Sequence, residues 1–167
     1  IYLVENNDDI KKLEISSSEV AYVTQTTLSV DETRELINSL KEKFPGIIGP
    51  SADDICYATQ NRQDAVKQLS LECQIVLVIG SQTSSNSNRL KELAEKCGTK
   101  SFLIDDKTDI DLNSLKDATS VGITAGASAP EEIVQEVISF LVPLGFKTVR
   151  NLSENNENMT FKLPKEL

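Results

Sequence analysis

Two parts of the chain combine residue types that can bind a metal and an anion. Cys56 lies in the sequence ICYATQNR at residues 55–62, and a loop rich in hydroxyl and amide side chains, GSQTSSNSNR, follows at residues 80–89. A thiolate is a soft metal ligand, whereas Ser, Thr and Asn side chains donate hydrogen bonds that hold anions. The pair predicts a metal site with an anion site beside it.

The loop at residues 80–89 follows a predicted strand and precedes a predicted helix. Residues 74–80 are almost all apolar and rich in β-branched side chains, which is typical of a strand buried on both faces of a parallel sheet. Apolar residues recur at helical spacing over residues 89–98, where Gly98 is a stop signal. Open α/β sheets bind ligands at the carboxyl edge, and the free N–H groups of a helix N-terminus favour anions there.

The same order of strand, small polar loop and helix occurs at residues 20–44 and again at residues 121–144. Thr26 lies in the first of these loops and Ser128 in the second. Gly126 is expected to let the backbone approach a ligand closely. Ser and Thr that merely cap a helix explain any one loop equally well. Three such loops together with a thiol favour a shared site.

The cysteines are expected to differ. Cys73 precedes a strand and Cys97 lies in the last turn of a helix, so both are interpreted as small, partly buried apolar side chains. From the residues alone, Cys56 is such a packing residue, a reactive thiol or a metal ligand. Three cysteines form no even disulfide framework and no C-x-x-C pair indicates zinc, which favours a reducing compartment.

Composition excludes some partners. The 167 residues are 39% hydrophobic, enough for one or two small domains, and no apolar run approaches the ~20 residues that span a membrane. A net charge of −9 disfavours nucleic acid and anionic lipid as partners. An anionic ligand would therefore be held mostly by dipoles, hydroxyls and backbone N–H groups, with Arg62, Arg89 and Lys91 as the cations within the motifs.

Four stretches stand in a specific order: TQTTLS at residues 24–29, DDICYAT at 53–59, SSNSNRL at 84–90 and GITAGASAP at 122–130. Together with the ending LPKEL at residues 163–167, they resemble the 4-hydroxy-3-methylbut-2-enyl diphosphate reductases, also called the LytB family. The resemblance spans the whole chain.

This resemblance implies an iron–sulfur oxidoreductase of the non-mevalonate isoprenoid pathway. In the family, a 4Fe-4S cluster is held by three cysteine thiolates, one from each of three similar α/β domains. Two electrons from a donor of the ferredoxin or flavodoxin type remove the allylic hydroxyl and give isopentenyl and dimethylallyl diphosphate. The cluster carries the hard chemistry, and the protein supplies ligation, position and a shielded cavity.

The residue roles follow from the same resemblance. It implies that Cys56 is a cluster ligand and that Thr26 is catalytic, since it would lie near the substrate hydroxyl and relay a proton. Asn88 and Arg89 are expected to fix the loop and its helix. Thr26 would also contact the substrate. The diphosphate would be held by hydroxyl and amide side chains, those of Ser84, Ser85, Asn86 and Ser128.

The chain is interpreted as a C-terminal fragment of such an enzyme, because it has no histidine and only one cysteine in a family motif. The predicted fold class is α/β, with small parallel-sheet βαβ domains, one complete and one partial, of a three-domain pseudo-symmetric enzyme. Residues 1–52 are expected to be the end of the middle domain, residues 53–145 a complete domain with the third cluster cysteine, and residues 146–167 a C-terminal tail.

The element order supports parallel βαβ units. Strands are predicted at residues 1–4, 20–23, 47–48, 74–80, 101–104 and 121–124, and helices at residues 8–13, 30–44, 62–71, 89–98, 112–116 and 131–144.

Two other readings stay open: a stand-alone α/β module that binds a phosphorylated metabolite without catalysis, and a folding unit without activity. The isolated chain is expected to be catalytically inactive under each of these readings, including the enzyme reading. The bacterial cytoplasm is the favoured compartment, with the plastid as the alternative. The upstream coding sequence would discriminate, since the enzyme requires two further cysteine motifs there.

Overall fold

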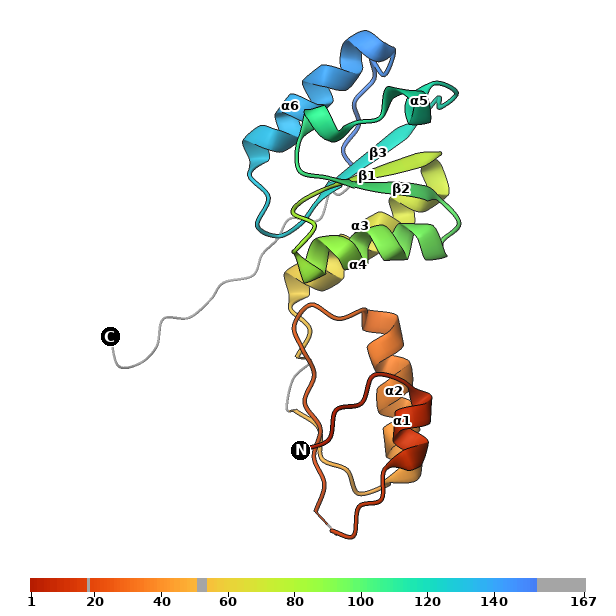
Figure 1. Cartoon of the computed structure of the whole chain (residues 1–167), viewed down its shortest axis with the longest axis vertical. Coiled ribbons are helices and arrows are strands. Elements are labelled where there is room, and N and C mark those ends of the chain that lie inside the picture. The colour runs from red at the N-terminus through yellow and green to blue at the C-terminus, as the bar shows by residue number, and fades with distance from the viewer. Residues whose placement is uncertain (18, 51–53, 153–167) are drawn as a thin grey trace, which may run out of the picture.

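The computed structural model describes residues 1–17, 19–50 and 54–152 (Figure 1). At its centre lies a parallel sheet of three strands in the order β2-β1-β3. All five residues of the central strand are buried, as its continuous apolar sequence predicts. The predicted α/β class is confirmed by the strands β1 (Ile75–Ile79), β2 (Lys100–Ile104) and β3 (Val121–Ala125).

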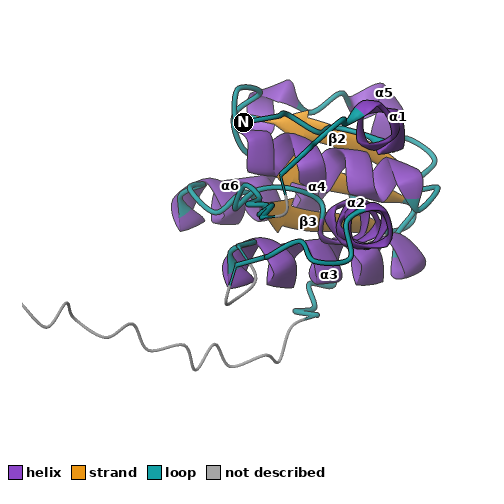
Figure 2. Ribbon diagram, turned by 90° about the horizontal axis from the view of Figure 1, so that it is seen from below, coloured by secondary structure: helices purple, strands orange, loops and turns teal. Residues whose placement is uncertain are grey.

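Helices cover both faces of the sheet (Figures 1 and 2). Because side chains alternate along a strand, Ile75, Leu77 and Ile79 join one core cluster, and Val76 and Val78 join the other. The first cluster includes residues of α5 (Leu112–Leu115) and α6 (Glu131–Leu141); the second includes residues of α3 (Tyr57–Glu72) and α4 (Ser85–Lys96). Two short 3-10 helices, η1 (Lys107–Asp109) and η2 (Val142–Leu144), complete this part.

The N-terminal part consists of α1 (Asn7–Lys12), α2 (Val30–Lys43) and the segments around them. The predicted strand at residues 1–4 is wrong, because these residues form no strand. The strands predicted at residues 20–23 and 47–48 reduce to a single parallel bridge between Ala21 and Ile48. A lone strand pair is marginal in water unless further strands or helices cover it. Here Ile48 and Val23 stay exposed.

Two helices begin earlier than their apolar pattern predicts. The helix α3 begins at Tyr57 rather than at residue 62, and α4 begins at Ser85 rather than at residue 89. The first four residues of α4 are all polar and those of α3 contain no large aliphatic side chain, so hydrophobic periodicity gives little signal there. As a result Cys56 and Ser84 are the N-cap residues of these helices.

Parts of the predicted domain division are not described by the structure. The boundary at residues 52 and 53 and most of the predicted tail, residues 153–167, lie outside the described residues. Residues 146–152 belong to no helix or strand. Among the described residues, no helix is long and apolar enough to cross a membrane.

Candidate functional site

The loop between β1 and α4 is held by its own hydroxyl and amide side chains. The Ser84 hydroxyl accepts hydrogen bonds from the Ser87 backbone N–H at 3.3 Å and from the Ser87 hydroxyl at 3.1 Å. Asn88 Nδ2 donates to the carbonyl oxygens of Gln82, at 2.7 Å, and Ser84, at 2.9 Å. The expectation that Asn88 fixes the loop is therefore confirmed. Arg89 instead pairs with Glu92 on α4 itself, at 2.6 Å.

Asn86 is the unusual residue of this loop. It is 7% exposed, yet neither its Oδ1 nor its Nδ2 has a hydrogen-bond partner among the described residues. Ser85 beside it is exposed, and no acceptor within the described chain meets the backbone N–H of either residue. A buried amide without partners is unfavourable by about 1–3 kcal/mol, so native proteins almost always satisfy it. The first turn of α4 therefore has the donors that an anion would complete.

The loop between β3 and α6 meets this first turn at Gly126. Gly126 N–H donates to the Ile79 carbonyl at 2.8 Å. A Cβ atom at Gly126 would lie 2.3 Å from Ser87 Oγ, and one at Gly80 would lie 2.2 Å from it. The missing side chain of Gly126 therefore lets Ser87 pack against its backbone. Close approach of a ligand to Gly126 stays a prediction. Ser128 follows in the same loop with an exposed side chain.

Cys56 and Thr26 are adjacent through the backbone. Cys56 N–H donates to the Thr26 carbonyl at 3.2 Å, and both side chains are exposed. Although Cys56 caps α3, its thiol makes no capping hydrogen bond. The sulfur is therefore available to an external ligand beside Thr26.

Side chains of the helix α3 connect the end of β3 with the loop that carries Thr26. Arg62 Nε donates to the carbonyl of Ala125, the last residue of β3, at 3.1 Å. Gln63 Oε1 accepts from Val30 N–H at 3.0 Å and its Nε2 donates to the Leu28 carbonyl at 2.8 Å. Sequence reasoning missed both roles, because a polar side chain that bonds to distant main chain leaves no periodic pattern.

These contacts link the loops that carry the predicted site residues. Cys56 touches the Thr26 segment, Arg62 reaches the end of β3 before Ser128, and Gly126 packs on the turn that begins at Ser84. Each of the three cations in the motifs already has a partner within the chain: Arg62 with carbonyl oxygens, Arg89 with Glu92, and Lys91 with Glu95 at 3.5 Å. Neutral hydroxyl, amide and backbone N–H groups remain as donors for an anion.

A model of the LytB protein family matches residues 1–142. The chain belongs to the LytB family. The 4-hydroxy-3-methylbut-2-enyl diphosphate reductase of Saccharophagus degradans is 56% identical over 100% of the chain and 54% of that relative. The relative with the same name from Serratia proteamaculans is 53% identical over 100% of the chain and 53% of its own length. The chain thus spans about half the length of the curated relatives it matches.

Solved structures agree with this LytB assignment. The E-1-hydroxy-2-methyl-but-2-enyl-4-diphosphate reductase from Plasmodium falciparum matches with a TM-score of 0.89 and 35% identity, over 99% of this chain and 53% of that one. A structure described as (E)-4-hydroxy-3-methyl-but-2-enyl diphosphate reductase, the terminal enzyme of the non-mevalonate pathway, matches with a TM-score of 0.52 and 26% identity, over 81% of this chain and 46% of that one.

The other two cysteines of the LytB chain lie apart from these loops. Cys73 is half-buried, as expected, and desolvation raises the pKa of its thiol, with the Glu72 carboxylate adding to the effect. Cys97 is exposed at the end of α4, so its predicted partial burial is wrong. No three His, Cys, Asp or Glu side chains of the described segments group together as a metal site. Cys56 therefore offers one ligand, not a complete set.

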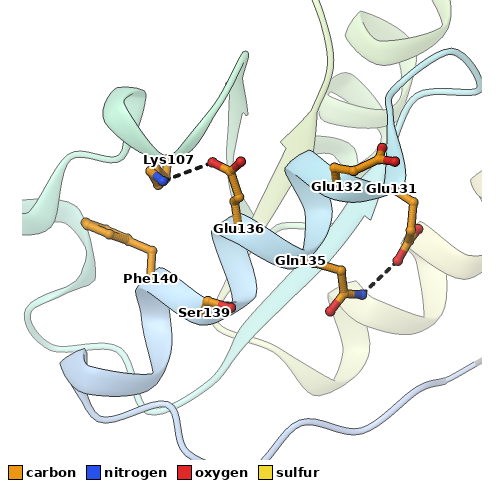
Figure 3. Close-up of a pocket in the computed structure, with 7 residues that line it drawn as sticks. All are labelled: Lys107, Glu131, Glu132, Gln135, Glu136, Ser139 and Phe140. Carbon is orange, nitrogen blue, oxygen red and sulfur yellow. Dashed lines mark hydrogen bonds and ion pairs between the residues drawn. The ribbon is translucent and has the colours of Figure 1, made fainter.

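A surface pocket of the LytB chain lies elsewhere, on the outer side of α6 (Figure 3). Lys107 and Glu136 pair there at 2.9 Å, and Glu131 and Glu132 also line it. None of the predicted site residues contributes to it. Its excess of carboxylates would repel a diphosphate, so the loop edge of the sheet is the better candidate for an anion.

Proposed function

We propose that this chain supplies the C-terminal part of a reductase that removes the hydroxyl of 4-hydroxy-3-methylbut-2-enyl diphosphate to give isopentenyl and dimethylallyl diphosphate. Membership of the LytB family and the names of its relatives support the reaction. The observation that carries the proposal is the buried amide of Asn86 without partners, in a turn that contacts the Ser128 loop.

The diphosphate is held by neutral donors at the start of α4. The Ser84 hydroxyl already accepts two hydrogen bonds, so its own proton is free to point outward. Asn86 Nδ2 and the backbone N–H groups of Ser85 and Asn86 add donors, and the exposed hydroxyls of Ser85 and Ser128 complete the set. Hydrogen bonds to a charged acceptor contribute roughly 1.5–3 kcal/mol each, and the positive end of the helix dipole favours the anion further.

Cys56 would hold one iron of a 4Fe-4S cluster. Its exposed thiol without a capping bond fits a ligand that reaches out of the chain, and the other thiolates would come from the part of the enzyme that this chain does not contain. When bound, the cluster supplies the electrons that cleave the allylic carbon–oxygen bond.

Thr26 would act on the leaving hydroxyl. Its backbone carbonyl accepts from Cys56 N–H, so its side chain lies beside the cluster ligand. A threonine hydroxyl both donates and accepts hydrogen bonds, which suits it to orient the substrate hydroxyl and pass a proton to it. Positioning of this kind contributes mainly to the chemical step.

The partners follow from the same proposal. Several apolar side chains of the N-terminal part are strongly exposed, including Leu3 at 78% and Val23 at 85%. These side chains would pack against the N-terminal part of the same enzyme, which provides the remaining ligands. A ferredoxin or flavodoxin would donate the electrons, and the bacterial cytoplasm would be the compartment.

The test uses a full-length reductase, made by joining this chain to the N-terminal part of the Saccharophagus degradans relative. After anaerobic reconstitution we expect a four-iron cluster and turnover of the allylic diphosphate. Cys56→Ser should lose both, whereas Ser84→Ala should keep the cluster and weaken substrate binding. Ser139→Ala, on the exposed side of α6, is the matched control and should change neither. A fully active, cluster-loaded Cys56→Ser protein would contradict the proposal.

The second candidate is a phosphometabolite-binding module without catalysis. It is favoured by the buried amide of Asn86, which has no partner among the described residues and would bind an anion without the help of a metal. The same experiment separates the two, because a binding module would take up diphosphate tightly and show no turnover with or without iron.

A further inference from the structure

We propose that Arg62 and Gln63, neighbours on α3, are positioning residues that hold the Ser128 loop and the Thr26 loop, respectively, at fixed distances from Cys56. This inference rests on the proposed reductase function. Consecutive residues of an α-helix point about 100° apart around its axis, so one helix can brace two different loops. Both residues lie about two turns after Cys56, which caps the same helix.

Gln63 holds the C-terminal end of the Thr26 loop by hydrogen bonds. It is 2% exposed, and both atoms of its amide are used by the main chain of that loop, through Val30 N–H and the Leu28 carbonyl. At the other end of the loop, Thr24 N–H and hydroxyl donate to Asp54, at 2.8 and 3.2 Å. The segment that carries Thr26 is therefore fastened on both sides.

The other contacts that α2 makes with α3 and α4 are weaker candidates for holding the Thr26 loop in place. They include the ion pairs Lys67–Asp31, at 2.7 Å, and Lys96–Glu32. All four side chains are at least a third exposed, and exposed ion pairs are screened and stabilise little. The buried Gln63 amide is the contact that fixes the position of the loop.

Arg62 fastens the second loop. Its Nε donates to the Ala125 carbonyl at 3.1 Å and its Nη1 to the Ala58 carbonyl at 3.2 Å. Ala58 lies in the first turn of α3, directly after Cys56 and Tyr57, and Ala125 ends β3 just before the Ser128 loop. The planar guanidinium makes both bonds at once, a geometry that a lysine ammonium on its flexible stem does not fix.

The two residues should therefore affect different kinetic constants. Displacing the Thr26 loop disturbs the group next to the substrate hydroxyl, so it lowers kcat. Displacing the Ser128 loop disturbs a diphosphate donor, so it raises KM. Misplacement by about 1 Å costs a reacting group up to about a hundred-fold in rate, so we expect changes of about ten- to a hundred-fold.

The test compares Gln63→Leu and Arg62→Met with Gln68→Leu in the full-length reductase. Gln68 is exposed on the same helix, and its Nε2 donates only to Glu72 Oε1, at 3.3 Å, among the described residues. The control therefore makes the same chemical change away from the loops. We expect Gln63→Leu to lower kcat at unchanged KM, Arg62→Met to raise KM, and Gln68→Leu to change neither. Arg62→Lys should recover part of the affinity. Equal behaviour of all variants, or the same constant changed by both, would overturn the inference.

Hydrogen exchange gives a readout that does not need activity. Gln63→Leu should speed amide exchange in residues 26–30, and Arg62→Met in residues 125–129, each without affecting the other segment. If Gln63→Leu does not fold, Gln63→Glu decides, since it keeps the acceptor for Val30 N–H and loses the donor to Leu28. Unchanged exchange in both segments would refute the positioning roles. An unsubstituted enzyme without turnover would refute only the proposed reaction.

Discussion

Gly126→Ala tests whether the Ser84 and Ser128 loops depend on one close contact. The new Cβ would lie 2.3 Å from Ser87 Oγ, a distance that forces the hydroxyl or the loop to move, and 3.6 Å from Ser87 Cβ, which is ordinary contact. Overpacking of this kind costs about 1–3 kcal/mol of stability. Because Ser87 Oγ also donates to Ser84, the shift should reach the cap of α4.

The clash can be removed by deleting the atom that causes it. Ser87→Ala alone loses the hydrogen bond to Ser84, worth about 0.5–1.5 kcal/mol. In the double variant the nearest atoms to the new Cβ are the residue 87 Cβ, at 3.6 Å, and the Ile79 carbonyl oxygen, at 3.7 Å, which are both ordinary contacts. The cost should therefore return to about that of Ser87→Ala. This corresponds to a coupling free energy equal to the cost of Gly126→Ala alone, about 1–3 kcal/mol, within the range for residues in contact.

Urea unfolding and calorimetric titration with inorganic diphosphate would measure both effects in the full-length reductase. Gly46→Ala is the control, because nothing lies within 4 Å of its Cβ position. Gly80→Ala should not be rescued by Ser87→Ala, since its φ is 157° and its Cβ also meets Ser87 Cβ at 2.9 Å. The reasoning is refuted if Gly126→Ala behaves like Gly46→Ala, or if the effects of Gly126→Ala and Ser87→Ala simply add.

Three further predictions concern the site and the thiols. Asn86→Leu should leave the ligand-free protein equally or more stable, by up to about 1–3 kcal/mol, because no hydrogen bond is lost; diphosphate affinity should fall about ten- to a hundred-fold, measured by calorimetry. Iodoacetamide at mildly alkaline pH should label Cys56 and Cys97 before Cys73, whose raised pKa shifts its thiolate to higher pH, as mass spectrometry would show. The 167-residue chain alone should form no stable 4Fe-4S cluster, and stoichiometric iron with turnover would contradict this.

The central strand of the sheet was predictable from its sequence alone, because a continuous apolar run is typical of a strand buried on both faces. The run from Ile75 to Ile79 is apolar at every position, and the strand is buried on both faces. The bridge between Ala21 and Ile48 shows the limit of that rule, since local β-branched sequence does not form a strand where too few neighbours cover it. Whether a segment pairs depends on partners that its own sequence does not contain.

The site was predictable as a set of motifs but not as a set of contacts. The order of strand, loop and helix picked out the hydroxyl loops, and the resemblance assigned Cys56 as a metal ligand. The hydrophobic pattern, however, began α3 too late to show that Cys56 caps it. The role of Gly126 could not be inferred either. A glycine in a loop is compatible with a ligand, a turn or a neighbouring side chain, and the contact with Ser87 can be seen only in the structure.

Two buried amides show what the structure adds to the sequence. Gln63 and Asn86 are both almost fully buried, and both stand in the first half of a helix next to a predicted binding loop. Both polar atoms of the Gln63 amide form hydrogen bonds with the main chain of the Thr26 loop, and these bonds offset the cost of burying the amide. Asn86 has no such compensation among the described residues, so a water molecule or a bound anion has to offset its burial. Replacing each by leucine should therefore give opposite results without ligand: a loss of stability at Gln63, and none at Asn86.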